Sequence, residues 1–541
     1  MYKKKLTAIG LVMVMTAATL AGCGNGSETT GGSAGDTATA QGQNTEVQSS
    51  QGQSDAGTGD KARITIMTID YNGSPLAADG SDEVKKRVEE HTGTIIDDST
   101  FIWVPNDTYT EKLGLTLLNK DNMPMILTVN GPVNSTIVQA ANAGAFWDLS
   151  DYIYDEAKYP NLAKMNKDVA QQVMVNGELI GIYRARAIGR NGFGYRQDWA
   201  DALGLGEPET LEDLYNMAYA FTYDDPDGNG IKDTYGFSFS KNTDPLDILQ
   251  TTFGSGNKWV EMDGELVPSH LTPEYMEALD WLKKMYDDGL VYEDWAVREK
   301  STATDAVKNG ECGMMADVLD ESRRIWDYFI NSEIPSVNGD GYASMNLVGA
   351  IKKDAGSEKT ILATSGMNGF FAITKAASEE DLENCLRFLD KMCDEEMILL
   401  ADYGMEGVTY DFDENGELVS SIQGVALNLH PHNGLNQAIA YIPNLLPETT
   451  KIQINEGRAL EYETREANEA YCVFNPAAAY LNNSETYSMN GGNLDEIIKR
   501  ARTQYICGEI DENGLKAQFD EWALAGGDKV VEEVNTQYKN R

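Results

Sequence analysis

The sequence predicts an α/β protein built as two lobes, and three observations support this. The part that follows residue 61 is long, it alternates strand-like with helix-like segments, and it contains no repeat of fixed period. A body of this length exceeds what one hydrophobic core usually organises, so two or more lobes are expected. The alternation is typical of a mostly parallel sheet, whereas a solenoid or a propeller would show a repeat.

The first residues have the features of a secretion signal. Lys3, Lys4 and Lys5 precede an uncharged stretch that ends in Leu-Ala-Gly-Cys at residues 20–23. This stretch of about 15 residues is short for a transmembrane helix, which needs about 20, and small residues stand where a peptidase would cut. We therefore expect residues 1–22 to be a signal peptide that is removed.

The Leu-Ala-Gly-Cys sequence resembles the bacterial lipobox, in which the cysteine thiol is diacylated and becomes the new N-terminus. The resemblance implies that Cys23 is a lipid anchor on the outer face of the cytoplasmic membrane; the alternative is an ordinary secreted protein. Residues 23–61 are small and polar without an aromatic side chain, so they cannot bury enough surface to fold. We expect a flexible low-complexity tether, with the lipid as the only membrane contact.

The charge of the chain excludes several classes of partner. Asp and Glu number 86 against 43 Lys and Arg, a net charge of −43, which argues against nucleic acid and anionic lipid headgroups. Beyond Cys23 there are five cysteines, an odd number that does not suit a disulfide framework. We expect them to be buried thiols, with Cys472 and Cys507 the one pair left open.

The first elements of the folded part alternate as in a parallel sheet. Residues 63–69 predict a buried strand, and a helix follows with its cap near Ser81. Residues 101–104 and 125–129 predict two more strands, with a helix over 106–119 between them. Ligands of such sheets lie beyond the carboxyl ends of the strands, so the loop at Asn130 is a candidate wall of a cleft.

Capping signals predict two later helices. Thr272 and Pro273 begin a helix that Gly289 ends, and Ser378 with Asp381 begins a second one. Short apolar runs at residues 312–316 and 369–374 lie between them, and we interpret the latter as a strand that returns to the first sheet.

Five stretches carry a resemblance to a known family: residues 195–205, 225–236, 289–291, 403–407 and 508–538. In this order they resemble extracellular solute-binding proteins of ABC importers, of the carbohydrate-type, maltose-binding-like group, and particularly its long lipoprotein branch in Firmicutes. The resemblance implies a two-lobed periplasmic-binding-protein-like fold of type II, with a hinge, a ligand cleft between the lobes, and closure on binding.

The lobes of that family are discontinuous along the chain. The resemblance implies a first lobe made of residues 62–184 plus 318–393. It implies a second lobe made of residues 185–317 plus 394–541.

A calcium-binding loop is predicted by oxygen-bearing residues at alternate positions, with Gly230 in sixth place: Asp225, Asp227, Asn229, Ile231 through its carbonyl, and Asp233. The twelfth position of an EF-hand is Gly236 here instead of glutamate. Similar loops in the family close the shell at positions nine and ten, which are Asp233 and Thr234. The calcium would be structural, and the alternative is a solvated turn between a helix and a strand.

Aromatic side chains are the first candidates for ligand binding, because sugar rings stack on them while sugar hydroxyls need polar partners. The aromatic candidates are Trp259, Trp103, Trp326 and Tyr410, and the polar candidates are Asn130, Arg196, Asp317 and Asn368. Trp259 is favoured because it follows the glycine-containing segment 254–257. For each aromatic residue the alternative is a place in the core.

These observations predict a solute-binding lipoprotein that captures an oligosaccharide and delivers it to the permease of an ABC transporter. From residue 62 onward no Gly-x-Ser-x-Gly, phosphate-binding loop or His-Glu-x-x-His occurs, so we expect no enzyme, no catalytic residue and no organic cofactor. We also expect a monomer without nucleic acid. The alternatives are a receptor for peptides or other small solutes, an anchored polysaccharide-processing enzyme, and a sensor for a membrane kinase.

Overall fold

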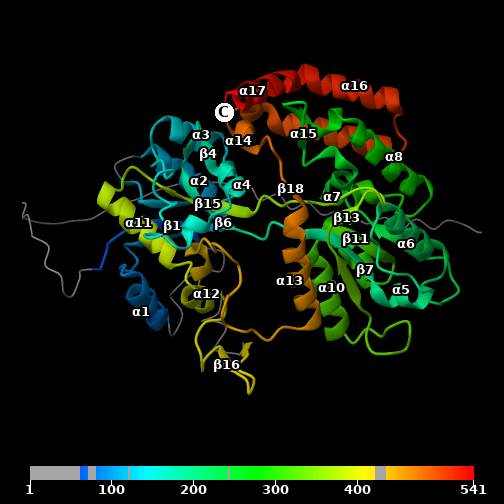
Figure 1. Ribbon diagram of the computed structural model, residues 1–541, viewed down its shortest axis with the longest axis horizontal. Coiled ribbons are helices and arrows are strands. Elements are labelled where there is room, and N and C mark those ends of the chain that lie inside the picture. The colour runs from blue at the N-terminus through cyan, green and yellow to red at the C-terminus, as the bar shows by residue number, and fades with distance from the viewer. Residues whose placement is uncertain (1–60, 71–80, 120–121, 242–243, 421–433, 541) are drawn as a thin grey trace, which may run out of the picture. The chain divides into compact units, whose positions relative to one another are not determined.

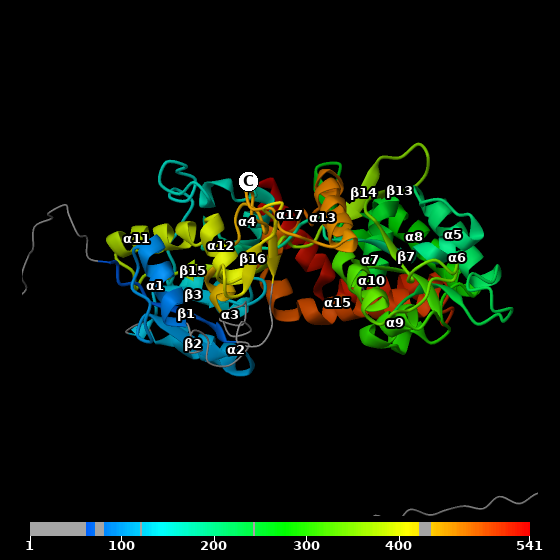
Figure 2. The same cartoon turned by 90° about the horizontal axis from the view of Figure 1, so that it is seen from below.

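A computed structural model describes residues 61–70, 81–119, 122–241, 244–420 and 434–540 (Figures 1 and 2). Cys23, the predicted signal peptide and all but the last residue of the predicted tether lie outside this part of the chain. The described residues form two main sheets, each with its own cover of helices.

The first sheet has five strands in the order β2-β1-β3-β15-β6. Three of them run parallel, with Ile66 paired to Phe101 and to Ile126, and β15 runs antiparallel to both of its neighbours. This confirms the predicted parallel strands and the return of β15 to the first sheet. The strands are β1 (Ile66–Asp70), β2 (Phe101–Pro105), β3 (Ile126–Val129), β6 (Gly181–Ala185) and β15 (Met367–Ile373).

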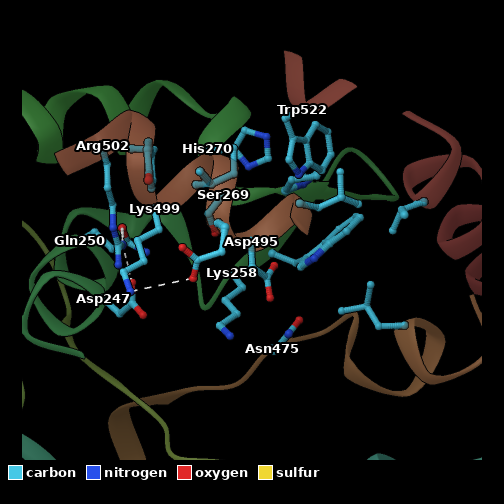
Figure 3. Close-up of a pocket in the computed structure, with 18 of the residues that line it drawn as sticks. Asp247, Gln250, Lys258, Ser269, His270, Asn475, Asp495, Lys499, Arg502 and Trp522 are labelled. Carbon is cyan, nitrogen blue, oxygen red and sulfur yellow. Dashed lines mark hydrogen bonds and ion pairs between the residues drawn. The ribbon is translucent and has the colours of Figure 1, made fainter. Parts of the chain in front are cut away.

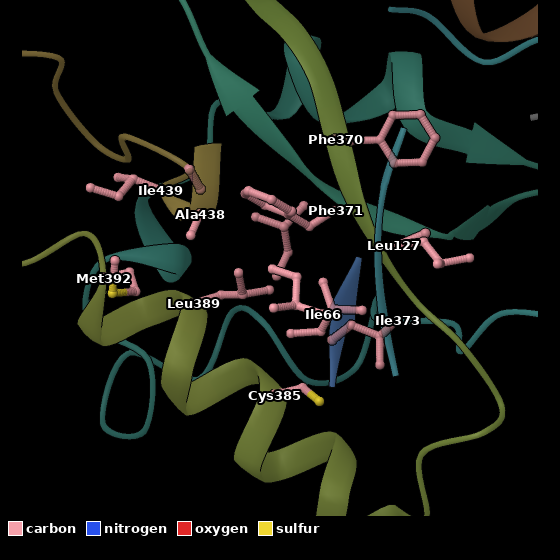
Figure 4. Packing of buried hydrophobic residues seen from close by; sticks show 14 of the residues in the cluster. Ile66, Leu127, Phe370, Phe371, Ile373, Cys385, Leu389, Met392, Ala438 and Ile439 are labelled. Atoms are coloured by element: carbon pink, nitrogen blue, oxygen red, sulfur yellow. The ribbon is translucent and has the colours of Figure 1, made fainter. Parts of the chain in front are cut away.

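The core of this lobe packs between the sheet and α11 (Glu379–Lys391), where Ile66 and Phe371 lie toward Leu389 (Figure 4). The helix begins as predicted, because the Ser378 hydroxyl accepts from the Asp381 amide while the Asp381 carboxylate accepts from the Ser378 amide. The other helices of the lobe are α1 (Ser81–Thr92), α2 (Asn106–Leu118), α3 (Ser135–Asn142), α4 (Lys167–Ala170) and α12 (Glu395–Asp402).

The second sheet has four strands in the order β12-β7-β11-β8. The central pair, β7 and β11, is antiparallel, and β8 lies parallel to β11. The strands are β7 (Asn191–Arg196), β8 (Tyr235–Ser238), β11 (Cys312–Val318) and β12 (Met345–Val348). The helices around it are α5 (Gln197–Leu203), α6 (Leu211–Tyr223), α7 (Asp244–Gln250), α8 (Pro273–Asp287), α9 (Lys300–Lys308), α10 (Leu319–Asn331) and α13 (Glu456–Asn468).

A third, smaller core joins the hairpin of β9 and β10 to the C-terminal helices. Trp259 and Leu266 from the hairpin pack there with Trp522 and Val530. The elements are β9 (Trp259–Met262), β10 (Glu265–Pro268), α14 (Ala478–Asn482), α15 (Glu485–Ile506), α16 (Glu512–Trp522) and α17 (Asp528–Lys539).

Short strands and helical turns complete the chain. The strands β16 (Tyr410–Phe412) and β17 (Leu418–Ser420) form a hairpin that turns at residues 413–417. The others are β4 (Met174–Val175), β5 (Glu178–Leu179), β13 (Ile351–Lys352), β14 (Lys359–Leu362), β18 (Cys472–Val473), η2 (Leu162–Lys164), η3 (Gln171–Val173), η4 (Thr251–Ser255), η5 (Ser269–Leu271), η6 (Trp295–Val297), η9 (Leu435–Ala438) and η10 (Glu469–Tyr471).

The division between the lobes differs from the predicted boundaries. Residues 318–366 were expected in the first lobe, but α10 and β12 pack in the core of the second sheet. Residues 394–442 were expected in the second lobe, but α12 and η9 pack in the core of the first. The reason is strand pairing, since β12 joins the second sheet beside β7 before β15 returns to the first.

Three segments cross from one core to the other: residues 186–190, 363–366 and 443–455. The first two are bonded to each other, because the Arg186 amide donates to the Gly366 carbonyl (2.9 Å) and the Thr364 amide donates to the Ile188 carbonyl (3.1 Å). Any movement of one lobe against the other must therefore bend both segments together.

Candidate functional site

A cavity of about 340 Å³ lies in the second lobe, with Trp259 in its wall (Figure 3). Its lining comes from α7, from the end of β10 and η5, and from one face of α15. In Figure 3 His270 and Trp522 lie at one end, and Asp247 and Arg502 lie at another. The cavity is in the size range of small-ligand sites.

Aromatic rings form much of the buried end of the cavity. Trp259, Tyr275 and Trp522 line it and are 6%, 2% and 5% exposed. The imidazole ring of His270 stands edge-on to Trp522, with 4.4 Å between the ring centroids. Such surfaces suit the C–H faces of a sugar ring.

The imidazole of His270 is uncharged. Burial lowers the pKa of His270 to about 3, because no nearby carboxylate offsets the loss of water. Among the described residues, neither its Nε2 atom nor the hydroxyl of the neighbouring Ser269 has a hydrogen-bond partner. Two neutral polar atoms of the cavity wall therefore have unused hydrogen-bonding capacity.

Charged side chains line the rest of the cavity. The Arg502 guanidinium donates to the Asp247 carboxylate (2.5 Å), and this pair is largely buried. Asp495 and Lys258 are exposed at the open side, where the two charges interact and the Tyr487 hydroxyl donates to Asp495 (3.2 Å).

The loop that leads to Trp259 is tied to the segments that connect the lobes. The side-chain amide of Asn257 donates to the carbonyls of Ala363 (3.2 Å) and Val473 (3.0 Å), which lie at the ends of β14 and β18. Ala363 opens one of the three crossing segments. A ligand that moved this loop would therefore act directly on the connection between the lobes.

A second groove, of about 470 Å³, lies where the two lobes meet. Tyr183 and Arg186 line it from the first lobe and the crossing segment, and Tyr462 and Arg465 of α13 line it from the second. Near this groove, burial raises the pKa of Asp402 to about 6, while a hydrogen bond from Tyr441 and the charge of Arg186 act in the opposite direction.

Of the predicted ligand-binding aromatics, Trp259 alone lines this cavity. Trp103 in β2 packs against the first core, with its ring 6.0 Å from Phe101. Trp326 packs on α13, which lies beside α10 in Figures 1 and 2. Tyr410 belongs to the β16–β17 hairpin and packs edge-on against Phe412.

Of the predicted polar residues, three lie at strand ends. Asn130 follows β3 and is exposed, and Asn368 in β15 accepts a hydrogen bond from Arg184 at its carbonyl (3.4 Å). Asp317 ends β11 and is paired with Lys300 (2.7 Å).

Arg196 is placed otherwise than predicted. It lies at the opposite end of the second sheet from Asp317, is 4% exposed, and donates through two nitrogens to the Asp198 carboxylate at 2.8 Å each. Its guanidinium also lies over the rings of Trp199 and Phe329. It therefore holds the second core together instead of facing a cleft.

Sequence reasoning missed most of the cavity. Asp495, Lys499 and Arg502 follow one another at spacings of four and three on α15, so they share one helix face. That spacing was a usable signal. The local sequence could not have predicted that Ser269 and His270 line the cavity, because helices far along the chain bury them there.

The predicted calcium loop joins α6 to β8. The Asn229 amide nitrogen donates to the carboxylates of Asp227 (2.6 Å) and Asp233 (3.4 Å), and the Gly230 amide donates to Asp225 (3.1 Å). The pKa of Asp227 is raised, first by burial and then by the neighbouring carboxylates. The Thr234 hydroxyl instead donates to the Phe221 carbonyl (2.8 Å).

Three further features of the described ranges concern metal binding, disulfides and membrane spans. No three His, Cys, Asp or Glu side chains of the described chain converge closely enough to hold a metal. The five cysteines after residue 61 are free thiols, including Cys472 and Cys507. Within the same ranges, no helix has the length and apolar character needed to cross a membrane.

Comparisons with known proteins define the class of this protein. The family model of the bacterial extracellular solute-binding protein matches residues 98–407. The lipoprotein LipO of Bacillus subtilis is 33% identical over 502 residues, which cover 90% of this chain and 94% of LipO. The chain belongs to the family of bacterial extracellular solute-binding proteins.

Two further relatives extend this finding. The polygalacturonan/rhamnogalacturonan-binding protein YtcQ of Bacillus subtilis is 31% identical over 512 residues, which cover 92% of this chain and 94% of YtcQ. A solved structure of an EF-hand mutant of the ABC-transporter substrate-binding protein FusA from Streptococcus pneumoniae, in complex with fructo-nystose, matches with a TM-score of 0.57 at 17% identity. It covers 88% of this chain and 99% of FusA. The match confirms the predicted fold class.

Proposed function

We propose that this protein is a lipid-anchored receptor that captures an oligosaccharide between its lobes, with part of the ligand in the second-lobe cavity at Trp259, and delivers it to an ABC permease, with no catalysis of its own. This cavity supports the proposal, because aromatic rings and polar groups both line its wall and Asn257, two residues before Trp259, donates a hydrogen bond to Ala363 in one crossing segment. The sugar-binding relative YtcQ supports a carbohydrate over a peptide.

Binding and transport would be linked through the crossing segments. A ligand held at Trp259 and at the groove beside Arg186 would favour one relative position of the lobes. The closed form would then present a surface that the permease recognises. We propose that the described residues within 62–185 and 367–442 form one lobe and those within 191–362 and 456–540 form the other, a division that the core clusters support.

Thermal unfolding of the full chain with a panel of oligosaccharides and peptides tests the receptor. A ligand that binds the folded state alone raises the melting temperature, and we expect this with one glycan series. Trp259→Phe should lose most of that rise, whereas Trp281→Phe should keep it, because Trp281 packs on Phe253 and Tyr215 outside the cavity. A rise with peptides alone would replace the sugar receptor with a peptide receptor.

We propose that calcium stabilises the loop of residues 225–233. Calcium would draw together the carboxylates of Asp225, Asp227 and Asp233, which do not converge on one point in this structure, and would also bind the Asn229 side chain and the Ile231 carbonyl. Their mutual contacts fit this role, since Asn229 already draws two carboxylates together. The solved structure of the FusA EF-hand mutant supports an EF-hand-like loop in a protein of this fold.

Cys23 is proposed as the lipid anchor, on the strength of the Leu-Ala-Gly-Cys sequence and the lipoprotein relative LipO. Fractionation of cells that produce Cys23→Ser tests this. The variant should leave the membrane fraction, and retention there would exclude the anchor.

A further inference from the structure

The cavity at Trp259 contains equal numbers of opposite charges. Its charged side chains are three cations and three anions: Lys258, Lys499, Arg502, Asp247, Asp495 and Glu496. His270 adds no charge, since its ring is neutral. A site built for a carboxylate-bearing sugar would offer a cation in excess.

Two of the three cations already have an anion within ion-pair distance, and the third lies near one. Arg502 donates to Asp247 (2.5 Å), and Lys499 lies 3.9 Å from Glu496 on the same helix. Lys258 makes no ion pair within 4 Å among the described residues, and its charge acts on Asp495 from a greater distance. A ligand carboxylate would have to displace one of these partners and leave an anion beside it.

The buried end offers neutral hydrogen-bonding groups instead of charges. Ser269 is 2% exposed and His270 is 7% exposed, and both line the cavity (Figure 3). Among the described residues, the Ser269 hydroxyl and His270 Nε2 have no hydrogen-bond partner. A hydroxyl both donates and accepts, so it can satisfy either group whichever tautomer the imidazole adopts.

Apolar surface surrounds these two groups. Trp259, Trp522 and Pro268 line the same end of the cavity. Leaving polar atoms unpaired in such surroundings costs free energy, which a bound sugar hydroxyl would recover. This combination suits a sugar ring that carries hydroxyls and no charge.

We infer that the ligand is a neutral oligosaccharide, one unit of which enters this cavity and is hydrogen-bonded by Ser269 and His270. The inference rests on the proposed function and names its ligand class. It separates this protein from a receptor for polyuronates, in whose site we expect cations to outnumber anions.

Calorimetric titration of the full chain tests the inference with three matched pairs of tetrasaccharides. The neutral members are tetramers of galactose, glucose and mannose, and the acidic members are tetramers of galacturonate, glucuronate and mannuronate. We expect at least one neutral tetramer to bind more tightly than its acidic counterpart. An acidic tetramer that binds more tightly than all neutral ones would overturn the inference and leave the receptor standing. Absence of binding to all six would overturn both.

Variants of the wall test the roles of individual groups. Ser269→Ala and His270→Gln should each weaken binding of the preferred neutral tetramer roughly threefold to tenfold, the usual effect of one hydrogen bond. Ser322→Ala is the matched control, because Ser322 is equally buried in the same lobe but lies on α10 outside the cavity. Unchanged affinity in both cavity variants would refute the assigned hydrogen bonds.

A charge variant tests the balance itself. Asp495→Asn removes the anion that faces Lys258, so the affinity for tetragalacturonate should rise about tenfold while that for the neutral tetramer stays nearly constant. No gain for the acidic sugar would show that charge balance does not set the preference.

Discussion

His270 is the residue whose burial has the clearest measurable consequence. Its pKa is about 3 in the folded protein, whereas an unfolded chain protonates histidine near 6.5. Between these values the unfolded state binds one more proton, so the free energy of unfolding falls as the pH falls. The loss is about 1.4 kcal/mol per pH unit. In urea unfolding from pH 7 to pH 4, His270→Gln should depend less on pH than the unaltered chain.

His91 provides a control of opposite sign. A hydrogen bond to Asp394 (2.8 Å) raises the pKa of His91, so its contribution to stability is fully present below the unfolded pKa and is lost as the pH rises through the folded pKa. The stability deficit of His91→Gln should therefore be greatest at acid pH. Parallel pH curves for all three chains would contradict the assignment of both histidines.

Single residues of the site were predictable only where local sequence decides their position. Trp259 was favoured because a glycine-containing segment precedes it; it lines the cavity and also packs in the third core, and its role in ligand binding stays a prediction. Arg196 was predicted to bind ligand, but in the structure it is buried in an ion pair with Asp198. The sequence alone does not show whether Asp198 turns inward to form this pair or outward to solvent. Ser269 and His270 gave no signal, since helices far along the chain bury them.

We predict that calcium stabilises the loop between α6 and β8. Three carboxylates repel one another there, which is one cause of the raised pKa of Asp227. A bound calcium ion would relieve this repulsion and, at a hundred times its dissociation constant, stabilise the fold by about 2.7 kcal/mol. We expect a chelator to lower the melting temperature of the full chain, and Asp227→Asn to remove that response.

The hairpin at Asp411–Gly416 supplies the control, because it has a similar sequence and turns between β16 and β17. Asp413→Asn should leave the calcium response intact. If Asp227→Asn and Asp413→Asn changed the chelator response of the melting temperature equally, or if the unaltered chain gave no response, calcium binding by the α6–β8 loop would be contradicted. The loop would then be a solvated turn.

Elements with strong local signals were predicted well. The caps at Thr272 and Ser378 set the starts of α8 and α11, and the apolar runs at 101–104 and 369–374 became β2 and β15. Two-residue strands such as β18 gave no pattern, because their pairing partner, β14, lies more than a hundred residues away.

The boundaries of the two lobes could not be predicted from the sequence. The sheet of each lobe is assembled from distant segments, and pairing of β12 with β7 and of β15 with β3 decides where the chain crosses between cores. Such long-range choices leave no local trace, so the two lobes were predictable but their boundaries were not. The crossing segments, and with them the position of the cavity, came from the structure alone.

The most direct measurement is a calorimetric titration of oligosaccharides into the full chain. The same titration is then made with the Trp259→Phe variant. The account predicts saturable binding of one sugar per chain, weakened in the variant and unaffected by Trp281→Phe. Saturable binding of peptides with no response to any sugar, or release of shortened sugars during the titration, would contradict it.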